Sequence, residues 1–415
     1  MNMKSKNEVN EIVNRPLCIC DSTLMDGEKA AGVIFSNIEK YRIAQLLDEA
    51  GVPQIMAGNP SLGAEEKMAV RHIARMGLGA SVMSWNRADI NDINRSIECD
   101  VDAVCISIPA SDNLIQNKLG KDHAWVADKV YEVASYAAEH GLYISVVAED
   151  TPNANLAFLI DFAKAAVDAG ADRVGYQDII GKEDPFTCYE RIKTLRQIMP
   201  VDIEIITRND FGLATANTLA ALKAGARFAN VTSMGIGERA GCAPLEEVAL
   251  AARHILNMEA GLDGTKFREI ADAVSLATGR AISPSKPIIG SNVFVQEAGI
   301  SVDGIIRDEN GEAFDPAEVG CQRSVMIGKH SGRNTIVSEM AQMGIEIDRK
   351  AASDLLDMVR KASTQMHRSI SQKELFLLYE DLMNGNDIFD ENDEPSAPVA
   401  EPAPVEETPA EQPQN

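Results

Sequence analysis

A short apolar run passes into a helical pattern at Ile205–Asn217, IITRNDFGLATAN, through polar and charged residues. Side chains of a strand alternate between its two faces, so Ile206 and Arg208 are predicted to point the same way. Arg208 then lies at the carboxyl end of the strand. We expect the active pocket at this junction between strand and helix.

The same alternation of apolar runs and helical patterns extends from Leu17 to about Met258. Several joints contain an alanine followed by a glycine, as at 50–51 and 169–170, where glycine can end a helix in the left-handed conformation. The predicted strands are Leu17–Asp21, Pro53–Ala57, Gly79–Trp85, Ala103–Ile108, Tyr143–Glu149, Arg173–Asp178, Ile203–Thr207 and Phe228–Thr232. Eight strand-helix units over about 240 residues fit an α/β fold of the (β/α)8 TIM barrel type, whose usual length is ~250 residues. A doubly wound sheet is the weaker alternative.

The chain is expected to have four parts. Residues 1–15 form a polar amino-terminal extension, and residues 16–282 form the barrel. Residues 283–383 are predicted as a linker and a small, mainly helical carboxyl-terminal region. Residues 384–415 are acidic and proline-rich and cannot bury enough apolar surface to offset chain entropy, so a disordered tail is predicted there. A solubilising role for this tail is favoured over specific docking.

The composition is that of a soluble globular protein. Of the 415 residues, 45% are hydrophobic and 25% are charged, which is enough to bury a large core. The net charge of −24 disfavours nucleic acid and anionic membrane surfaces as partners. No apolar run approaches the roughly 20 residues of a membrane span, and the first residues lack the apolar core of a signal peptide, so a cytoplasmic location is expected. The seven cysteines include no C-x-x-C pair, and we predict reduced thiols in the core, with no disulfide and no zinc ribbon.

Active sites of TIM barrels lie at the carboxyl ends of the strands, so polar residues there are the first candidates. They are Asp21, Ser84, Ser107, Glu149, Asp178, Thr207, Arg208 and Thr232. After the eighth predicted strand follows Gly235–Gly241, GIGERAG, whose backbone amides can cradle an anion near a helix start. This glycine pattern does not follow the first strand of a nucleotide-binding fold, so a dinucleotide site is rejected.

Residues 206–217 closely resemble the H-x-H-N-D-x-G-x-A-x-A-N signature of the homocitrate synthase and isopropylmalate synthase family. The resemblance implies a TIM barrel and a metal-dependent Claisen condensation of acetyl-CoA with a 2-oxoacid such as 2-oxoglutarate. Ile206 and Arg208 stand where the family has its two metal-binding histidines. The matching residues are Asn209, Asp210, Gly212, Ala214, Ala216 and Asn217. The chain length and the run GLATANTLAA at 212–221 are most similar to homocitrate synthase of the nitrogen-fixation type.

The first predicted strand leads into a second motif of the same family. Asp21–Lys29, DSTLMDGEK, resembles D-x-T-L-R-D-G-E-Q. The resemblance implies that Asp26 is the carboxylate that binds the divalent metal, and Asp26 is then the only retained metal ligand. Met25 replaces the arginine that contacts the 2-oxoacid and polarises its carbonyl. Glu28 matches the family motif.

Three motifs of the family are present with substitutions, and one is intact. Asp178–Gly181 resembles D-T-V-G, with isoleucine in place of a hydroxyl residue. Gly237–Ala243 matches except at Cys242, where the family has asparagine beside the metal. Gln296–Gly304 resembles H-E-A-G-I-H-V-D-G with both histidines replaced, and Gly328–Gly332, GKHSG, is complete.

The resemblance also implies roles for individual residues. Glu149, in the acidic pair after the fifth strand, corresponds to the retained catalytic acid. The predicted substrate-binding residues are Asp26, Glu28, Arg208, Asp210, Thr232, Arg239 and His330.

The substitutions concentrate on the polar groups of one pocket, whereas the glycines and strand patterns of the scaffold are intact. A Claisen condensation must polarise a keto carbonyl, remove a proton from the methyl group of acetyl-CoA and stabilise an enolate. The leading hypothesis is therefore a homocitrate-synthase-like pseudoenzyme that has lost metal-dependent catalysis and works as a noncatalytic partner or ligand-binding paralogue. No cofactor is predicted for it.

Two alternative functions stay open. An active acyltransferase with a rearranged site would make homocitrate, for instance in nitrogen fixation, and would need a divalent metal. A metal-free lyase is the third hypothesis. The resemblance further implies a homodimer, or a heterodimer with an intact family member. Arg208 and Arg239 could hold a small 2-oxo dicarboxylate. The competing interpretation is that Arg208 pairs with Asp26 or Glu149 and fills the place of the metal.

Overall fold

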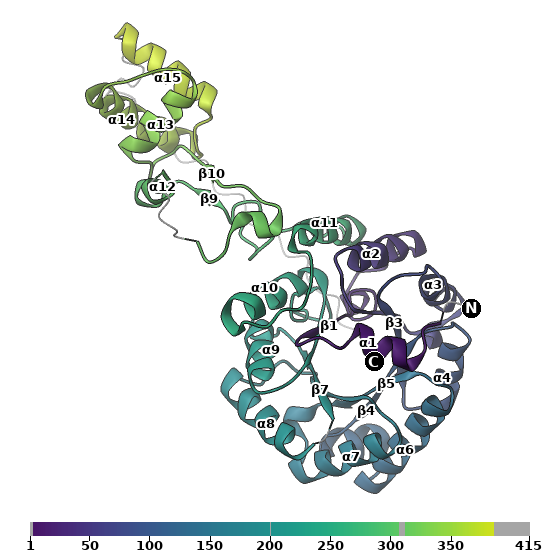
Figure 1. Ribbon diagram of the computed structural model, residues 1–415. Helices are drawn as coiled ribbons and strands as arrows, with labels where there is room; N and C mark the ends of the chain where they lie inside the picture. Colours follow the sequence, from purple (N-terminus) through teal and green to yellow (C-terminus); the bar gives the residue numbers. More distant parts are fainter. Residues whose placement is uncertain (1–2, 200, 307–311, 386–415) are drawn as a thin grey trace, which may run out of the picture. The chain divides into compact units, whose positions relative to one another are not determined.

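Eight parallel strands close into a barrel in which the last strand pairs with the first (Figure 1). The computed structural model describes residues 3–199, 201–306 and 312–385. The strands are β1 (Cys18–Asp21), β2 (Gln54–Gly58), β3 (Ser81–Arg87), β4 (Ala103–Pro109), β5 (Tyr143–Glu149), β6 (Arg173–Asp178), β7 (Asp202–Thr207) and β8 (Phe228–Val231). The predicted TIM barrel is confirmed, because each predicted strand overlaps an observed one and the strands are neighbours in chain order.

The helices that follow the strands along the chain form the outer layer of the barrel. They are α2 (Asn37–Glu49), α3 (Ala64–Ala74), α4 (Ile90–Ile97), α5 (Asp112–Leu114), α6 (His123–Glu139), α7 (Leu156–Asp168), α8 (Pro185–Ile198), α9 (Ala214–Lys223), α10 (Leu245–Leu256) and α11 (Phe267–Thr278). Ser36 begins α2 in a capping box with Glu39. Gly51 follows α2 at φ 81°, in the left-handed region that glycine adopts without a steric penalty.

The strands bury both of their faces. On one face, side chains such as Ile19, Val104 and Ile205 pack with helix residues in the main hydrophobic core. On the other face, Cys20, Met83, Cys105, Ile206 and Phe228 are among the residues of an inner cluster that fills the barrel. The seven cysteines are free thiols, as predicted.

A buried ion pair lies in the barrel interior between β6 and β7. Arg173 Nε donates to Glu204 Oε2 at 2.7 Å, and both side chains are fully buried. The hydroxyl of Ser145 and the amide of Asn230 also donate to the Glu204 carboxylate. The guanidinium carbon of Arg173 lies 4.3 Å from the ring centroid of Phe228. Neighbouring strands thus hold two opposite charges away from water.

The helix α1 (Lys6–Ile12) packs at the amino-terminal end of the barrel (Figure 1). Residues 1–15 were expected to form a polar extension, yet Val9 and Val13 are buried and belong to the inner cluster. The cluster also contains the first residues of β5 and β8, Tyr143 and Phe228. Arg227 Nη1 donates to the carbonyl of Val13 at 2.8 Å. Two valines four residues apart therefore place this segment in the core.

Asp21, the last residue of β1, is a buried carboxyl group with one unpaired oxygen. Its Oδ1 accepts from the Thr23 amide at 2.9 Å, whereas Oδ2 has no hydrogen-bond partner. The pKa of Asp21 is raised to about 7, mainly by burial and to a smaller extent by the charge of Glu246. A folded-state pKa above the unfolded value means that this group contributes stability below pH ~4, and that the contribution is lost as the pH rises towards 7.

We therefore expect Asp21→Asn to stabilise the protein at neutral and alkaline pH. The asparagine keeps an acceptor for the Thr23 amide and carries no charge to bury. The gain in unfolding free energy relative to wild type is expected to grow from pH 4 to pH 7, reaching a few kcal/mol, and to stay constant above that. Urea unfolding at several pH values measures this difference. A difference that does not change with pH would contradict the assignment.

The carboxyl-terminal region forms a second compact unit. The first unit comprises residues 1–294 and 313–322, and the second comprises 295–312 and the chain from 323 onward. The elements of the second unit are β9 (Val295–Gln296), α12 (Gly299–Ile306), β10 (Ser324–Val325), α13 (Arg333–Gln342), α14 (Arg349–Met366) and α15 (Gln372–Asn384). The last three helices pack around a separate apolar cluster that includes Ile336, Leu355 and Leu375.

The mainly helical character predicted for this region is confirmed. The predicted acidic tail lies outside the described residues from 386 onward. Within the described residues, no helix combines the length and the apolar character that a bilayer crossing requires.

Candidate functional site

Arg208 and Asp26 form an ion pair at the carboxyl ends of β7 and β1, a place we call the barrel mouth. Arg208 directly follows β7, and its backbone bridges to Cys242 in the loop after β8. Its Nη2 donates to Asp26 Oδ1 at 3.0 Å, and its Nη1 donates to Cys242 Sγ at 2.7 Å. Only 4% of Arg208 is exposed. The guanidinium is therefore held inside the barrel mouth and does not project into solvent.

The charges at the barrel mouth stabilise one another. Burial raises the pKa of Asp26, but Lys29, whose Nζ lies 2.9 Å from Oδ1, and Arg208 outweigh burial and hold this pKa well below its usual range. Burial raises the pKa of the Cys242 thiol to about 11 in spite of the nearby guanidinium. Asp26 thus stays a carboxylate and Cys242 stays a neutral thiol at physiological pH.

The residues at the barrel mouth do not fit a divalent metal. The carboxylate of Asp26 is already neutralised by two cations, Lys29 and Arg208, which would repel a metal ion. The neighbouring thiol is protonated, and Ile206 offers no donor atom. Zinc and related metals are bound by thiolate, imidazole and carboxylate groups. Across the described part of the chain, no three His, Cys, Asp or Glu residues are grouped as a metal site.

The interior next to this ion pair is apolar. Met25 and Ile206 are 7% and 5% exposed and belong to the inner cluster, against which Trp85 packs. The Lys29 ammonium lies 5.3 Å from the Trp85 ring centroid, a cation–π contact. Met25 and Ile206, which replace an arginine and a histidine of the family motifs, therefore pack in the apolar interior.

Two predicted carboxylates have partners of their own. Glu149 ends β5, and it accepts from the Ser107 hydroxyl at 2.8 Å and lies 3.3 Å from the Lys118 ammonium. Glu28 accepts from the Phe35 amide at 3.1 Å and pairs at 2.7 Å with Lys40, which is only 2% exposed. The competing interpretation from the sequence was that Arg208 pairs with Asp26 or Glu149. In the structure Arg208 pairs with Asp26, whereas Glu149 contacts Ser107 and Lys118.

Asp210 and Arg239 join three loops at the carboxyl face of the barrel. Arg239 Nε donates to Asp210 Oδ1 at 2.6 Å, and its Nη2 donates to the Ile179 carbonyl at 2.7 Å. Asp178 accepts from the amides of Gly181 at 2.8 Å and Glu183 at 3.1 Å, which fixes the turn after β6. Both carboxylates, predicted from motifs, therefore hold loops in place.

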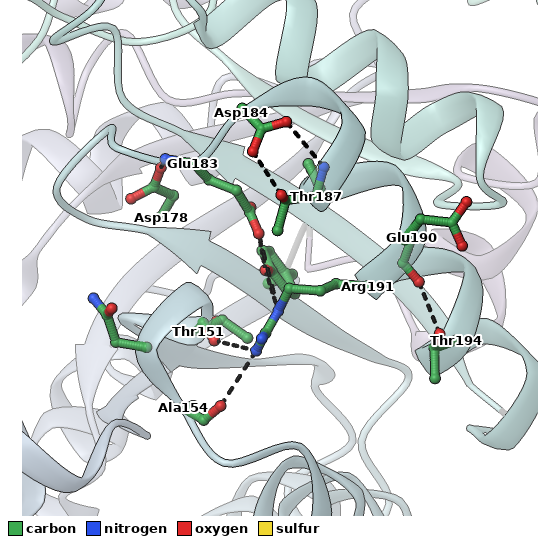
Figure 2. Close-up of polar contacts among 12 residues, drawn as sticks. Thr151, Ala154, Asp178, Glu183, Asp184, Thr187, Glu190, Arg191 and Thr194 are labelled. Carbon is green, nitrogen blue, oxygen red and sulfur yellow. Dashed lines mark hydrogen bonds and ion pairs between the residues drawn. The ribbon is translucent and has the colours of Figure 1, made fainter.

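A polar network behind this turn was not predicted from the sequence (Figure 2). Arg191 of α8 donates to the carbonyls of Thr151 and Ala154 at 2.9 and 3.2 Å. The Tyr176 hydroxyl donates to Glu183 at 2.7 Å. These contacts bind the loops after β5 and β6 to α8. No motif marks them, and the carbonyls that Arg191 contacts lie 40 and 37 positions away in the sequence.

The glycine-rich loop after β8 lines a pocket of about 290 Å³. Gly241 must be glycine, because a Cβ there would lie 2.0 Å from the Gly235 carbonyl oxygen. Thr232 closes the turn by donating to the Ile236 carbonyl at 2.7 Å. The cationic lining residues are Arg239, Arg280 and Lys286. The predicted anion cradle is thus accompanied by three positive charges, although Lys286 also pairs with Glu246 and Glu247.

His330 belongs to the second unit. Its backbone amide donates to Glu297 Oε1 at 3.1 Å, and its side chain is exposed. Gln296 and Ser301, which replace the two family histidines, lie in β9 and α12 of the same unit.

Comparison with known proteins covers both units. Residues 16–274 match the HMGL-like family, and residues 288–367 match the homocitrate synthase post-HMGL domain-like family. The 2-isopropylmalate synthase 2 of Caldanaerobacter subterraneus subsp. tengcongensis is 48% identical over 371 residues, which are 89% of this chain and 97% of that protein. Homocitrate synthase 1 of Nostoc sp. is 40% identical over 361 residues, 87% of this chain and 96% of that protein.

Solved structures confirm the barrel fold. The hydroxymethylglutaryl-CoA lyase of Pseudomonas aeruginosa superposes with a TM-score of 0.58 at 16% identity, covering 68% of this chain and 96% of that one.

Proposed function

The chain belongs to the HMGL-like family, among relatives named homocitrate, isopropylmalate and citramalate synthases, and from this premise we propose a protein that has lost metal-dependent condensation. It works as a noncatalytic ligand-binding paralogue or partner. One observation carries the proposal: the Arg208 guanidinium donates to Asp26 at 3.0 Å inside the barrel mouth, where the resemblance implies a metal.

The missing groups act on the same step of the reaction. Polarising the 2-oxoacid carbonyl needs a Lewis acid or a positive donor next to it, and removing the acetyl proton needs a positioned base. Met25 and Ile206 have no charge to offer, and Arg208 is already paired. Each lost donor to a developing oxyanion typically costs about 3 kcal/mol of transition-state stabilisation. Several losses together would remove measurable turnover.

Ligand binding fits the pocket beside the glycine-rich loop better than the barrel mouth. Two of the Arg208 nitrogens already donate to protein partners, which favours the interpretation that this residue replaces the metal. Arg280 lines the glycine-rich pocket and is exposed, whereas Arg239 in the same lining is paired with Asp210. A small dicarboxylate such as 2-oxoglutarate would be held there by charge and by backbone amides.

The test measures metal, turnover and binding on one purified sample. We expect less than one equivalent of bound metal, no release of CoA from acetyl-CoA with a panel of 2-oxoacids, and calorimetric binding of 2-oxoglutarate in the presence of a chelator. Arg280→Ala should weaken that binding about tenfold, the size of one charge-assisted contact. One tightly bound metal that is lost in Asp26→Ala together with CoA release would overturn the proposal.

The runner-up is an active acyltransferase with a rearranged site. It is favoured by Glu149, which is retained at the end of β5, and by the 48% identity to a protein named 2-isopropylmalate synthase. The same CoA assay separates the two functions. We also propose a homodimer or a heterodimer with an intact relative, and a monomer in sedimentation with and without that relative would exclude it.

A further inference from the structure

The second unit contains a pocket whose lining is basic. The pocket has a volume of about 660 Å³ and lies between α14 and the loop that precedes α13. Its lining residues are Lys329, His330, Arg360, Lys361, Thr364 and Gln365. We call it the basic pocket. Three cationic side chains and one histidine meet here in a chain whose net charge is −24.

Two side chains of the basic pocket have no polar partner among the described residues, and a third has only distant ones. Among the described residues, the Lys329 ammonium and the His330 ring have no hydrogen-bond or ion-pair partner. Arg360 contacts Asp357 and the Ser331 carbonyl at 3.5 Å each, at the outer limit for such contacts. By contrast, Arg239 lies 2.6 Å from its carboxylate. The carboxylate of Glu297 accepts from the His330 backbone amide at 3.1 Å.

Rigid elements present these side chains. The Gly328 amide donates to the Ser331 hydroxyl at 2.9 Å, which closes the turn that carries Lys329 and His330. Gly299 and Gly332 approach so closely that a Cβ on Gly299 would lie 2.7 Å from Gly332. Arg360 lies on α14, whose opposite face is buried in the apolar cluster of this unit. The backbone positions that carry these side chains are therefore fixed, which lowers the cost of ordering the site around a ligand.

We propose that the basic pocket binds a phosphorylated small molecule through its phosphate groups. A phosphate offers several anionic oxygens at once, and a guanidinium and ammonium groups are its usual protein partners. The pocket volume exceeds that of one phosphate, so a diphosphate ester fits the chemistry. This inference goes beyond the proposed function, since it concerns the second unit alone and its test does not depend on turnover.

Isothermal titration of the full-length protein with inorganic pyrophosphate tests the proposal. We expect saturable binding at one site, which weakens as the salt concentration rises. Arg360→Ala and Lys329→Ala should each weaken binding roughly tenfold. Arg349→Ala is the matched control, since it removes the same charge from an exposed position on the first turn of the same helix, outside the pocket.

Three outcomes would overturn the proposal. They are an absence of saturable binding in the wild type, an equal loss in the Arg349→Ala control, and binding that Arg360→Ala and Lys329→Ala leave unchanged. Deleting residues 386–415 completes the experiment. A large gain in pyrophosphate affinity after that deletion would show that the acidic end of the chain itself competes for the pocket, and would overturn a small-molecule ligand. Unchanged affinity supports a small-molecule ligand. Circular dichroism of each variant confirms that it folds.

Discussion

The double substitution Ile206→His with Arg208→His is expected to create a metal site in the barrel mouth. Both positions point into the barrel from β7 and its end, and Arg208 already reaches Asp26. The change removes one of the two cations that neutralise Asp26 and adds two imidazoles beside it. Affinity for zinc or manganese should rise by at least roughly 100-fold over wild type, since ligand sets of this kind supply most of a site's affinity.

Equilibrium dialysis with metal analysis measures this gain. Adding Asp26→Ala to the double variant should abolish it, which separates the designed site from binding elsewhere. We expect no CoA release from the double variant, because Met25, Gln296 and Ser301 still lack the side chains that the family resemblance implies. Metal affinity equal to that of the wild type would show that the barrel mouth cannot hold a metal in this geometry.

Glu204→Ala is expected to cause the largest loss of stability. Burial lowers the pKa of Arg173, but the charge of Glu204 raises it well above its ordinary value, so the guanidinium stays charged. Removing Glu204 leaves that charge in the barrel interior without a counterion. The unfolding free energy should fall by about 3–5 kcal/mol, the usual cost of breaking a buried ion pair.

Two further variants control this prediction in urea unfolding. Glu269→Ala breaks the exposed pair with Arg42 and should cost less than about 1 kcal/mol. Replacing both buried partners, Arg173→Met with Glu204→Leu, should recover most of the loss because no uncompensated charge remains. A cost for Glu204→Ala that is no larger than that for Glu269→Ala would contradict the buried-charge argument.

The barrel could be predicted because its signals are local. The strands β5 and β6 have the predicted limits, since each is bounded by a helix-ending glycine and a polar carboxyl end. The pairing of Arg208 with Asp26 could be predicted only as one of two options. Which carboxylate an arginine meets depends on distances across the barrel, and here Glu149 is occupied by Ser107.

Other contacts gave no usable signal in the sequence. Lys40 lies buried between Glu28 and Glu66, and each is a common residue in an ordinary helical or loop pattern. Glu28, predicted as a site residue from its motif, forms an ion pair with this lysine. Val9 and Val13 indicate the burial of α1 only weakly in the sequence, because the residues around them are polar.

The position of α1 also sets an order of events during synthesis. The ribosome makes this segment before the barrel strands, but Val13 is bound by Arg227, a residue 214 positions later in the chain. At the usual ~5–20 residues per second, roughly 10 to 40 seconds pass before that partner is made. During this time the Val13 carbonyl lacks its Arg227 donor, and the inner cluster around Val9 and Val13 is incomplete. Chaperones that bind short apolar segments have that interval in which to act, and a polypeptide released before β8 lacks both Arg227 and Phe228 as partners for this segment.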